Sequence, residues 1–127
     1  MKTAVVILNW NGAKLLQQFL PSVLQFSGDA TIYVADNAST DTSIDVLKNE
    51  FPTIKIIENA ENYGFAKGYN SALKQVESNY YVLLNSDVEV TPQWLEPMVD
   101  LLETDRQIAA CQPKLLSFHE KDSFEYA

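Results

Sequence analysis

Short, continuous apolar runs alternate along the chain with stretches in which apolar residues recur every three to four positions. The continuous runs are rich in β-branched and aromatic residues, which is typical of strands that are covered on both faces. They lie at Thr3–Leu8, Thr31–Ala35, Ile54–Glu58 and Tyr80–Asn85. We expect the last of these to be a buried central strand. The periodic stretches between the runs predict helices.

Strands that alternate with helices predict an α/β fold, in which a mostly parallel sheet is flanked by helices. The first helix is predicted within "AKLLQQFLPSVLQF", where Pro21 should kink or break it. The second is predicted from about Asp41 to Phe51, and Pro52 should end it.

Two further helices and one extended segment are predicted after residue 60. The third helix lies in "AKGYNSALKQVE" and has one apolar face, which consists of Ala66, Tyr69, Leu73 and Val76. The fourth should begin with Thr91 as the N-cap and Pro92 at the first helical position, with a kink at Pro97. The inward face of this helix consists of Trp94, Leu95, Met98 and Leu102. The segment "IAACQPKLLSF" predicts one more strand or a bent extended stretch.

Length and composition indicate one ordinary globular domain that spans residues 1–127. The chain is 46% hydrophobic and 20% charged, and its net charge of −8 argues against a broad basic surface for nucleic acid. Cys111 is the single cysteine, so no intrachain disulfide is expected. The N-terminus lacks the features of a signal peptide, and no apolar run approaches about 18 residues. We therefore expect a cytoplasmic protein and leave peripheral attachment to the inner face of the cell membrane open.

Parallel sheets bind ligands beyond the carboxyl ends of their strands. The four segments that follow the predicted strands are all rich in Asn, Asp, Ser and Gly. They read "NWNG", "DNAST", "NAENYGFAKG" and "NSDVE". The topology therefore predicts that these segments meet at one edge of the sheet and form the binding site. The sequence contains neither G-x-G-x-x-G after the first strand nor a G-K-[ST] phosphate loop.

Asp87 follows the fourth predicted strand and is the candidate metal ligand. A divalent cation that binds phosphate needs hard oxygen ligands and keeps several waters, so one or two carboxylates suffice. Ser86 and Asn85 place a hydroxyl and an amide beside it. The alternative is that Asp87 only caps or turns the chain, a frequent role of aspartate in loops.

Asp36 directly follows the second predicted strand and is the candidate nucleotide contact. Its carboxylate is suited to accept a hydrogen bond from a pyrimidine N3–H or a sugar hydroxyl. The alternative is helix capping. We assign that role to Ser39, Thr40 and Asp41, because they are good N-cap and first-turn residues.

The segment "ENYGFAKGYN" contains Gly64 and Gly68, which allow a positive φ or a close backbone approach. Asn62 is a neutral hydrogen-bonding residue, and Lys67 is suited to meet a phosphate. The alternatives are helix–sheet packing for Gly68 and a solvated surface position for Lys67.

Trp10 and His119 carry weaker signals. Trp10 either stacks on a ligand or packs against the rim of the sheet, and rim packing is favoured because aromatic side chains mostly contribute buried area. His119 is the single histidine, and nothing pairs it with Cys111 or Ser86 in a nucleophilic triad. We expect His119 at the surface.

Four motifs stand in order along the chain: "VVILNWNG", "VADNASTD", "ENYGFAKGYN" and "VLLNSDVEV". Together they resemble the N-terminal half of family 2 glycosyltransferases, a group with the GT-A fold that includes bacterial rhamnosyltransferases. The resemblance covers roughly residues 3 to 116. It implies a Rossmann-like domain of the GT-A type that binds a nucleotide sugar.

The resemblance also implies a ligand, a cofactor and the residues that hold them. The donor is a nucleotide-diphosphate sugar, linked to UDP or dTDP, and the cofactor is Mg²⁺ or Mn²⁺. Nucleotide contacts are implied at Asn9, Asn11, Asp36, Asn62, Gly64, Gly68, Asn85 and Ser86. The implied metal ligand is Asp87. Asn85 stands where the family's D-x-D motif has its first acid, which removes one negative charge.

The implied activity is that of an inverting glycosyltransferase of hexosyltransferase type. It transfers a sugar to a hydroxyl of an acceptor glycan or lipid-linked saccharide, in the synthesis of polysaccharides or glycoconjugates. The metal neutralises the departing diphosphate, and a carboxylate deprotonates the acceptor. Neither Glu120, Asp122 nor Glu125 matches the position of that general base. We therefore expect the chain to stop before the acceptor-binding half and to be inactive as a transferase by itself.

Two other functions stay open. One is a non-catalytic nucleotide-binding or regulatory α/β module such as a receiver, although Asn9 stands where a receiver has acids. The other is a nucleotidyltransferase, although "NWNGAKLLQ" is not a phosphate loop rich in Gly and Arg. If a second half is missing, exposed apolar surface should lead to homodimers or aggregates.

Overall fold

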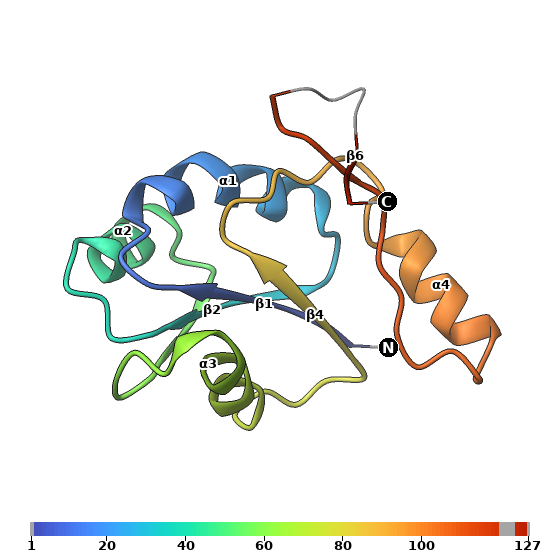
Figure 1. Cartoon of the computed structure of the whole chain (residues 1–127), viewed down its shortest axis with the longest axis horizontal. Helices are drawn as coiled ribbons and strands as arrows, with labels where there is room; N and C mark the ends of the chain where they lie inside the picture. The colour runs from blue at the N-terminus through green and yellow to red at the C-terminus, as the bar shows by residue number, and fades with distance from the viewer. Residues whose placement is uncertain (1, 120–123, 127) are drawn as a thin grey trace.

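The computed structural model describes residues 2–119 and 124–126 and contains a four-stranded parallel sheet (Figure 1). The strands are β1 (Thr3–Asn9), β2 (Thr31–Asp36), β3 (Lys55–Glu58) and β4 (Tyr80–Asn85). Their order across the sheet is β3-β2-β1-β4, so β1 lies between β2 and β4. The predicted α/β fold with a mostly parallel sheet is confirmed. Glu120 and Asp122, which were weighed as general bases, lie outside the described residues.

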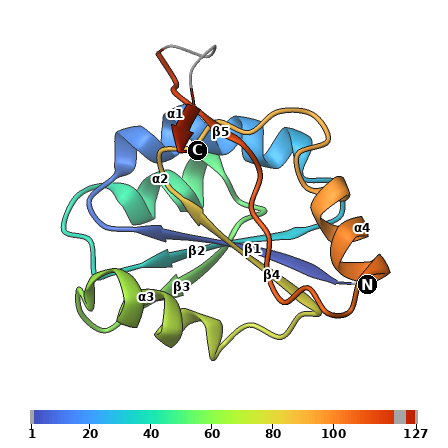
Figure 2. The ribbon, with the colours of Figure 1, turned by 45° about the vertical axis from the view of Figure 1, so that its right-hand side comes forward.

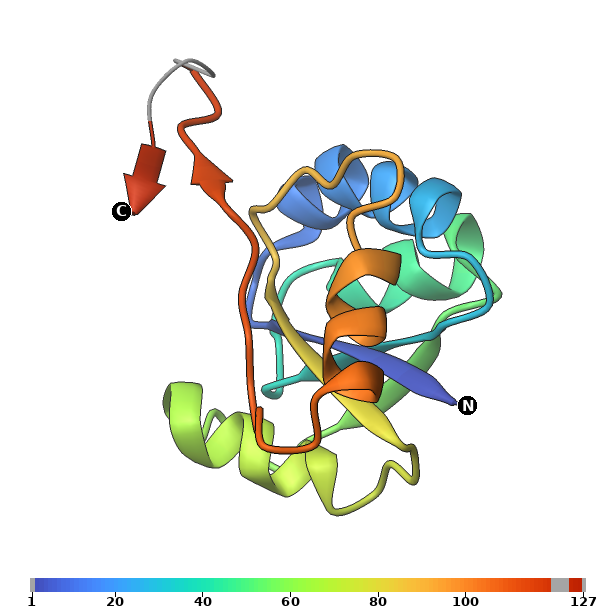
Figure 3. The same cartoon turned by 90° about the vertical axis from the view of Figure 1, so that its right-hand side faces the viewer.

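Helices cover both faces of the sheet. They are α1 (Ala13–Phe26), α2 (Ser43–Glu50), α3 (Gly64–Leu73) and α4 (Glu96–Thr104). Helices α1 and α2 lie together on one side and α3 lies on the other, as Figures 1 and 2 show. The end of helix α4 lies near the start of β4, where Leu102 and Glu103 line one pocket with Asn79 and Tyr80, and Figures 2 and 3 show the helix from two sides. Strand β5 (Leu115–Leu116) pairs antiparallel with β6 (Phe124–Tyr126) in a separate two-stranded sheet.

The four parallel strands end level at one edge of the sheet. In their register Asn9 pairs with Asp36, and Asp36 pairs with Glu58. On the other side of β1, Leu8 pairs with Asn85. Each loop after a strand therefore begins at the same edge, as the alternating pattern predicted.

Two apolar clusters fill the two sides of the sheet. Strand β1 contributes Val5 and Ile7 to the side of α1 and α2, and it contributes Ala4 and Val6 to the side of α3. Alternate residues of a strand point to opposite faces, so a strand that is buried on both faces must be continuously apolar. This explains the unbroken apolar run at the start of the chain.

Strand β4 is an edge strand, and the prediction of a buried central strand is wrong. Within the described residues it pairs with β1 alone. Val82 and Leu84 pack into the cluster on the side of α1, whereas Tyr81 and Leu83 on the other face are 45% and 53% exposed. Helix α3 contacts β1 and β2 and leaves this face of β4 open. A continuous apolar pattern shows that both faces are hydrophobic, but it does not show whether a helix covers them.

Helix α1 continues through Pro21, so the predicted break does not occur. Proline has no backbone N–H, and the carbonyl of Gln17 therefore loses its intrahelical partner. Both residues are exposed, so water can satisfy that carbonyl. The exposed position explains why the helix tolerates a proline in its interior.

Helix α4 begins at Glu96, and the predicted start at Thr91 is wrong. Pro97 consequently falls in the first turn of the helix, where a missing N–H costs no intrahelical bond. The kink expected at Pro97 therefore has no cause. The segment predicted as a strand or extended stretch contributes only Leu115–Leu116 to a strand.

Helices α2 and α3 differ from the predictions in detail. Helix α2 begins at Ser43, two residues after the predicted start. On α3, Ala66 is exposed, while Gly68 and Ala72 join Tyr69 on the buried face. In the part of the chain that the structure describes, no helix has the length and apolarity of a membrane span.

We expect Pro21→Ala to raise the free energy of unfolding by about 1–3 kcal/mol, because alanine restores the helical bond to the Gln17 carbonyl. Urea denaturation followed by circular dichroism measures the change. The control is Gln18→Ala at an exposed position of the same helix, which should change stability by less than about 0.5 kcal/mol. An unchanged or lower stability of Pro21→Ala would contradict this account of α1.

Candidate functional site

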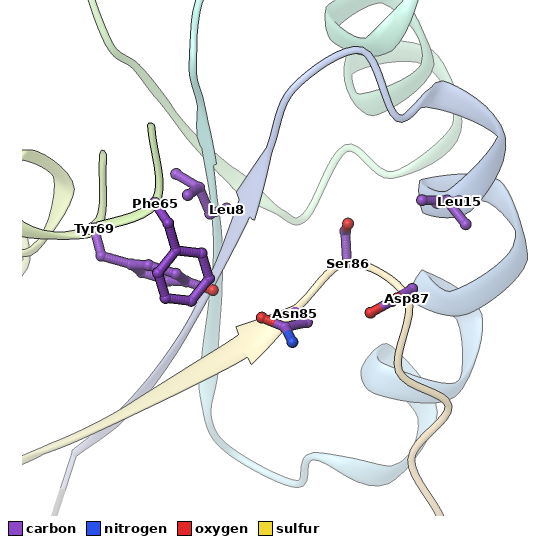
Figure 4. Close-up of a pocket in the computed structure, with 7 residues that line it drawn as sticks. All are labelled: Leu8, Leu15, Phe65, Tyr69, Asn85, Ser86 and Asp87. Carbon is purple, nitrogen blue, oxygen red and sulfur yellow. The ribbon is translucent and has the colours of Figure 1, made fainter. Parts of the chain in front are cut away.

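A cavity of about 310 Å³ opens at the carboxyl edge of the sheet, between the ends of β1 and β4. Its lining consists of Leu8, Leu15, Phe65, Tyr69, Asn85, Ser86 and Asp87 (Figure 4). The strand order reverses here, because β2 and β3 lie on one side of β1 and β4 lies on the other. Ligands of open α/β sheets bind at such a reversal. Of the predicted site residues, Asn85, Ser86 and Asp87 line this cavity.

These three residues leave the sheet directly after β4. Asn85 and Asp87 are exposed, and Ser86 is half-buried. Figure 4 shows the Asp87 carboxylate turned toward the side of Asn85. Among residues 2–119 and 124–126, no three His, Cys, Asp or Glu side chains gather into a metal site. Asp87 is thus a single exposed carboxylate, and a cation bound to it would need its other ligands from phosphate and water.

Asp36 is buried at 2% exposure, and its carboxylate is held by hydrogen bonds within the protein. Oδ1 accepts from Asn9 Nδ2 at 2.9 Å and from the Ser39 hydroxyl at 2.7 Å. Oδ2 accepts from the Ser39 backbone N–H at 2.9 Å. The carboxylate thus joins the end of β1 to the loop after β2, and it lies outside the cavity lining.

Asn11 joins the same two loops from the other direction. Its Oδ1 accepts hydrogen bonds from the backbone N–H groups of Thr40 at 2.7 Å and Asp41 at 3.2 Å. Its own N–H donates to the Ser39 hydroxyl at 2.9 Å. The φ angle of Asn11 is 50°, a left-handed conformation that asparagine tolerates better than most residues. The side chain of Asn11 is therefore engaged in holding the loops together.

Of the residues predicted to cap the second helix, Asp41 holds its first turn. Oδ1 accepts from the Ser43 N–H at 2.9 Å, and Oδ2 accepts from the Ala13 N–H at 3.2 Å, at the start of α1. Ser39 and Thr40 bond instead to the side chains that join the two loops. Desolvation by burial acts to raise the pKa of Asp41, but hydrogen bonds from Ser43 and Ala13 outweigh it and lower the pKa.

Two buried asparagines, which the sequence analysis did not single out, hold the loop between β3 and α3. Asn37 Nδ2 donates to the Gly64 carbonyl at 3.0 Å. Asn59 Nδ2 donates to Asn37 Oδ1 at 2.8 Å and to the Gly68 carbonyl at 3.3 Å. Both asparagines directly follow polar strand ends, in "DNAST" and "NAENYG". That position was the available signal, but it does not separate a ligand contact from a structural bond.

Gly68 lies where α3 approaches the sheet most closely. It is buried, and a Cβ atom at this position would lie 2.8 Å from Asn37 Nδ2 and 2.9 Å from Leu8 Cδ1. This distance is too short for a side chain without movement of a neighbour. The geometry therefore supports the helix–sheet packing alternative for this glycine.

The turn before α3 contains the other predicted residues of this segment. Asn62 Oδ1 accepts from the Gly64 N–H at 3.0 Å, and Gly64 has a φ of 76°, which favours glycine. Lys67 is exposed, and its ammonium lies 4.5 Å from the centroid of the Tyr63 ring. Trp10 is 55% exposed, and its packing against the rim of the sheet stays a prediction.

The apolar wall of the cavity was not predicted. Phe65 and Tyr69 lie one helical turn apart on α3, with ring centroids 5.0 Å apart and planes at 72°. The spacing of four residues was visible in the sequence, but it also describes an ordinary core face. His119 is exposed, as predicted.

Comparison with known proteins finds a matching family and several relatives. The model of the family described as Glycosyl transferase family 2 matches residues 4–126. An uncharacterized glycosyltransferase of Nostoc sp. is 33% identical over 109 residues, which cover 82% of this chain and 34% of the relative. Chondroitin synthase of Escherichia coli is 26% identical over 117 residues, covering 87% of this chain and 17% of the synthase. The chain thus spans about a third or less of the length of these curated relatives.

Solved structures of glycosyltransferases share the fold. A mannosyltransferase from Pyrobaculum calidifontis, in complex with GDP-Man and Mn²⁺, has a TM-score of 0.71 at 22% identity and covers 79% of this chain and 32% of its own. S. aureus TarS 1-349, in complex with UDP-GlcNAc, has a TM-score of 0.70 at 23% identity. The match covers 84% of this chain and 32% of the TarS chain. At these identities the likeness shows the fold, which is of the GT-A type.

We expect Gly68→Ala to lower the free energy of unfolding by about 1–3 kcal/mol, since the added methyl group forces Asn37 or Leu8 to move. Urea denaturation measures the loss. Ala66→Ser, at an exposed position of the same helix, is the control and should stay within about 0.5 kcal/mol of wild type. An unchanged free energy of unfolding in Gly68→Ala would show that α3 does not need to lie so close to the sheet.

Folding lowers the pKa of Asp41, so its ionised form stabilises the folded state above the unfolded-state pKa near 3.8. This contribution is lost as the pH falls through the lower folded-state pKa. We expect Asp41→Asn to be less stable than wild type at about pH 6, and we expect the difference to shrink as the pH falls below about 4. Urea midpoints across this pH range measure it. A difference that is constant with pH, as expected for the control Gln18→Ala, would contradict the role of the Asp41 charge.

Proposed function

Because the chain belongs to glycosyl transferase family 2, we propose that it binds the nucleotide-diphosphate sugar donor of a glycosyltransferase. The observation that carries this proposal is the position of Asn85, Ser86 and Asp87. They line a cavity at the reversal of strand order, where ligands of open α/β sheets bind. Family membership favours the transferase over a non-catalytic nucleotide-binding module.

We propose that Asp87 holds Mg²⁺ or Mn²⁺ together with the diphosphate of the donor. The exposed carboxylate provides one hard oxygen ligand, and phosphate oxygens and water provide the rest. The bound metal would neutralise charge on the departing diphosphate. The mannosyltransferase of Pyrobaculum calidifontis was solved with GDP-Man and Mn²⁺, which supports the use of a divalent cation. Asn85 supplies an amide in place of a second charge, and it can donate to a sugar or nucleotide oxygen.

The base of the donor is proposed to lie toward Asp36 and Trp10. Oδ2 of Asp36 accepts one hydrogen bond, so this oxygen keeps a second lone pair for a pyrimidine N–H. Because the carboxylate is buried, the loop at Ser39 must open for that contact. Trp10 exposes more than half of its surface, which leaves a ring face free for stacking on a base. Among the donors, UDP- and dTDP-linked sugars suit this arrangement.

The remaining nucleotide contacts are proposals of a different kind. Asn9 ends β1, Asn11 and Asn62 lie in loops, and Gly64 and Gly68 lie in the first turns of α3. All five make hydrogen bonds or close contacts within the protein. We propose that they shape the nucleotide site by holding these loops. A direct contact of any of them with the nucleotide stays a prediction.

We propose donor binding by this chain as one part of a larger reaction. We propose an inverting transfer of a hexose to a hydroxyl of a glycan or lipid-linked saccharide, in which a carboxylate removes the hydroxyl proton. No residue of this chain is assigned as that base. The chain spans about a third of the curated relatives' length, and its own contribution is proposed to be donor binding. The rhamnosyltransferase subtype stays a prediction.

We expect the protein to bind UDP or dTDP in the presence of Mn²⁺, and we expect Asp87→Ala or EDTA to weaken that binding. The loss should reach about 100-fold, since changes to mere partners of metal ligands already cost about 10–100-fold. Isothermal titration calorimetry measures the affinities. Asp29→Ala removes an exposed carboxylate near the opposite edge of the sheet and should leave them unchanged. Equal binding by all proteins, with and without EDTA, would rule out the metal site.

A further inference from the structure

Tyr69 connects helix α3 to the end of β4, directly before the Asn85–Ser86–Asp87 segment. Its side chain is 3% exposed, and its hydroxyl donates a hydrogen bond of 2.9 Å to the Leu84 carbonyl. Leu84 immediately precedes Asn85 in the chain. Tyr69 lines the cavity together with Asn85, Ser86 and Asp87 (Figure 4). One side chain of α3 therefore reaches across β1 to the strand that carries the candidate metal ligand.

Strand β4 is an edge strand, as β3 is, and it needs such a contact more than the inner strands β1 and β2 do. Within the described residues β1 is its single neighbour in the sheet, and their register ends where Leu8 pairs with Asn85. Asn85 and Asp87 beyond this point are exposed, and the chain packs into the core again only at Val88 and Val90. A buried hydrogen bond at Leu84 ties the end of the strand to a second element.

The phenol ring is itself firmly placed. Tyr69 belongs to the apolar cluster that contains Val6, Ala35 and Ala72, and its ring meets Phe65 edge to face. Burial raises the pKa of Tyr69, so the hydroxyl stays protonated and remains a donor at neutral pH. The side chain can therefore hold the Leu84 carbonyl at a fixed position relative to α3.

We propose that Tyr69 is a positioning residue, which fixes the Asn85–Ser86–Asp87 segment through its hydrogen bond to Leu84. The placement of Asp87 decides whether a cation can be shared with the diphosphate of the donor, and a misplacement of about 1 Å can cost about 100-fold in activity. The inference rests on the proposed function for the identity of the ligand. The other part of the proposal, that Tyr69 orders residues 85–87, does not depend on which ligand binds.

The test compares two tyrosines that both bond to the backbone. Tyr69→Phe removes only the hydroxyl that reaches Leu84. The matched control is Tyr81→Phe, because the Tyr81 hydroxyl donates to the Val76 carbonyl at 3.0 Å and accepts from the Ser78 N–H at 3.1 Å. These contacts lie near the start of β4, away from the cavity. A purely structural effect should therefore look similar in the two variants.

Hydrogen–deuterium exchange gives the first measurement, on peptides that cover residues 83–89. Exchange should be about tenfold faster in Tyr69→Phe, as expected for one lost hydrogen bond, and unchanged in Tyr81→Phe. Calorimetry with UDP and Mn²⁺ gives the second. The affinity should fall about tenfold in Tyr69→Phe, the effect of losing a partner that orients a metal ligand, and stay at the wild-type value in Tyr81→Phe.

Unchanged exchange in Tyr69→Phe, or equally fast exchange in Tyr81→Phe, overturns the proposal. Faster exchange with an unchanged UDP affinity also overturns it, because the segment would then be ordered by Tyr69 without consequence for binding. If the wild-type protein binds no nucleotide with Mn²⁺, the proposed function fails. The exchange data then decide by themselves whether Tyr69 orders residues 85–87.

Discussion

The parallel pairing of β1 with β2 on one side and β4 on the other is the constraint on which the candidate site depends. It places the carboxyl ends of the four strands at one edge of the sheet, so segments that are far apart in the sequence meet there. It also creates the reversal of strand order between Leu8 and Asn85, where the cavity opens. The pairing is secured by the burial of β1 on both faces. The position of this site therefore follows from the order of the strands, whether or not a ligand is bound.

At this edge, side chains take over the hydrogen bonding that the sheet no longer provides. Backbone groups at the end of a sheet need partners, and the last backbone bonds run from the Asn37 N–H to the Asn9 carbonyl and from the Asn59 N–H to the Asp36 carbonyl, both at 2.8 Å. The side chains of these four residues are buried and bond to one another or to the adjacent loops. The loop between β3 and α3 is thereby held in place without a ligand, which lowers the cost of ordering it when one binds.

The sequence predicted what depends on local pattern and on topology. The strands and the edge at which Asp87 emerges follow from continuous apolar runs and from the alternation of strands with helices. The exposed face of β4 could not be predicted, because it depends on where α3 lies across the sheet. The tolerance of Pro21 depends on which side of α1 meets water. The different burial of Asp36 and Asp87 was also hidden, since both are aspartates at strand ends, and only the packing around Asn9 and Ser39 buries one of them.

The buried pair Asn37 and Asn59 bears on how natural or engineered variants of this chain should be interpreted. Neither residue lines the cavity, yet replacing one leaves the other with an unsatisfied buried group, at a cost of about 1–3 kcal/mol. In a cell, a loss of this size lowers the amount of folded protein, because quality control degrades what unfolds. A survey that scores cellular activity alone would rank these asparagines beside Asp87. Only when protein abundance is counted separately does the survey distinguish residues that build the site from residues that use it.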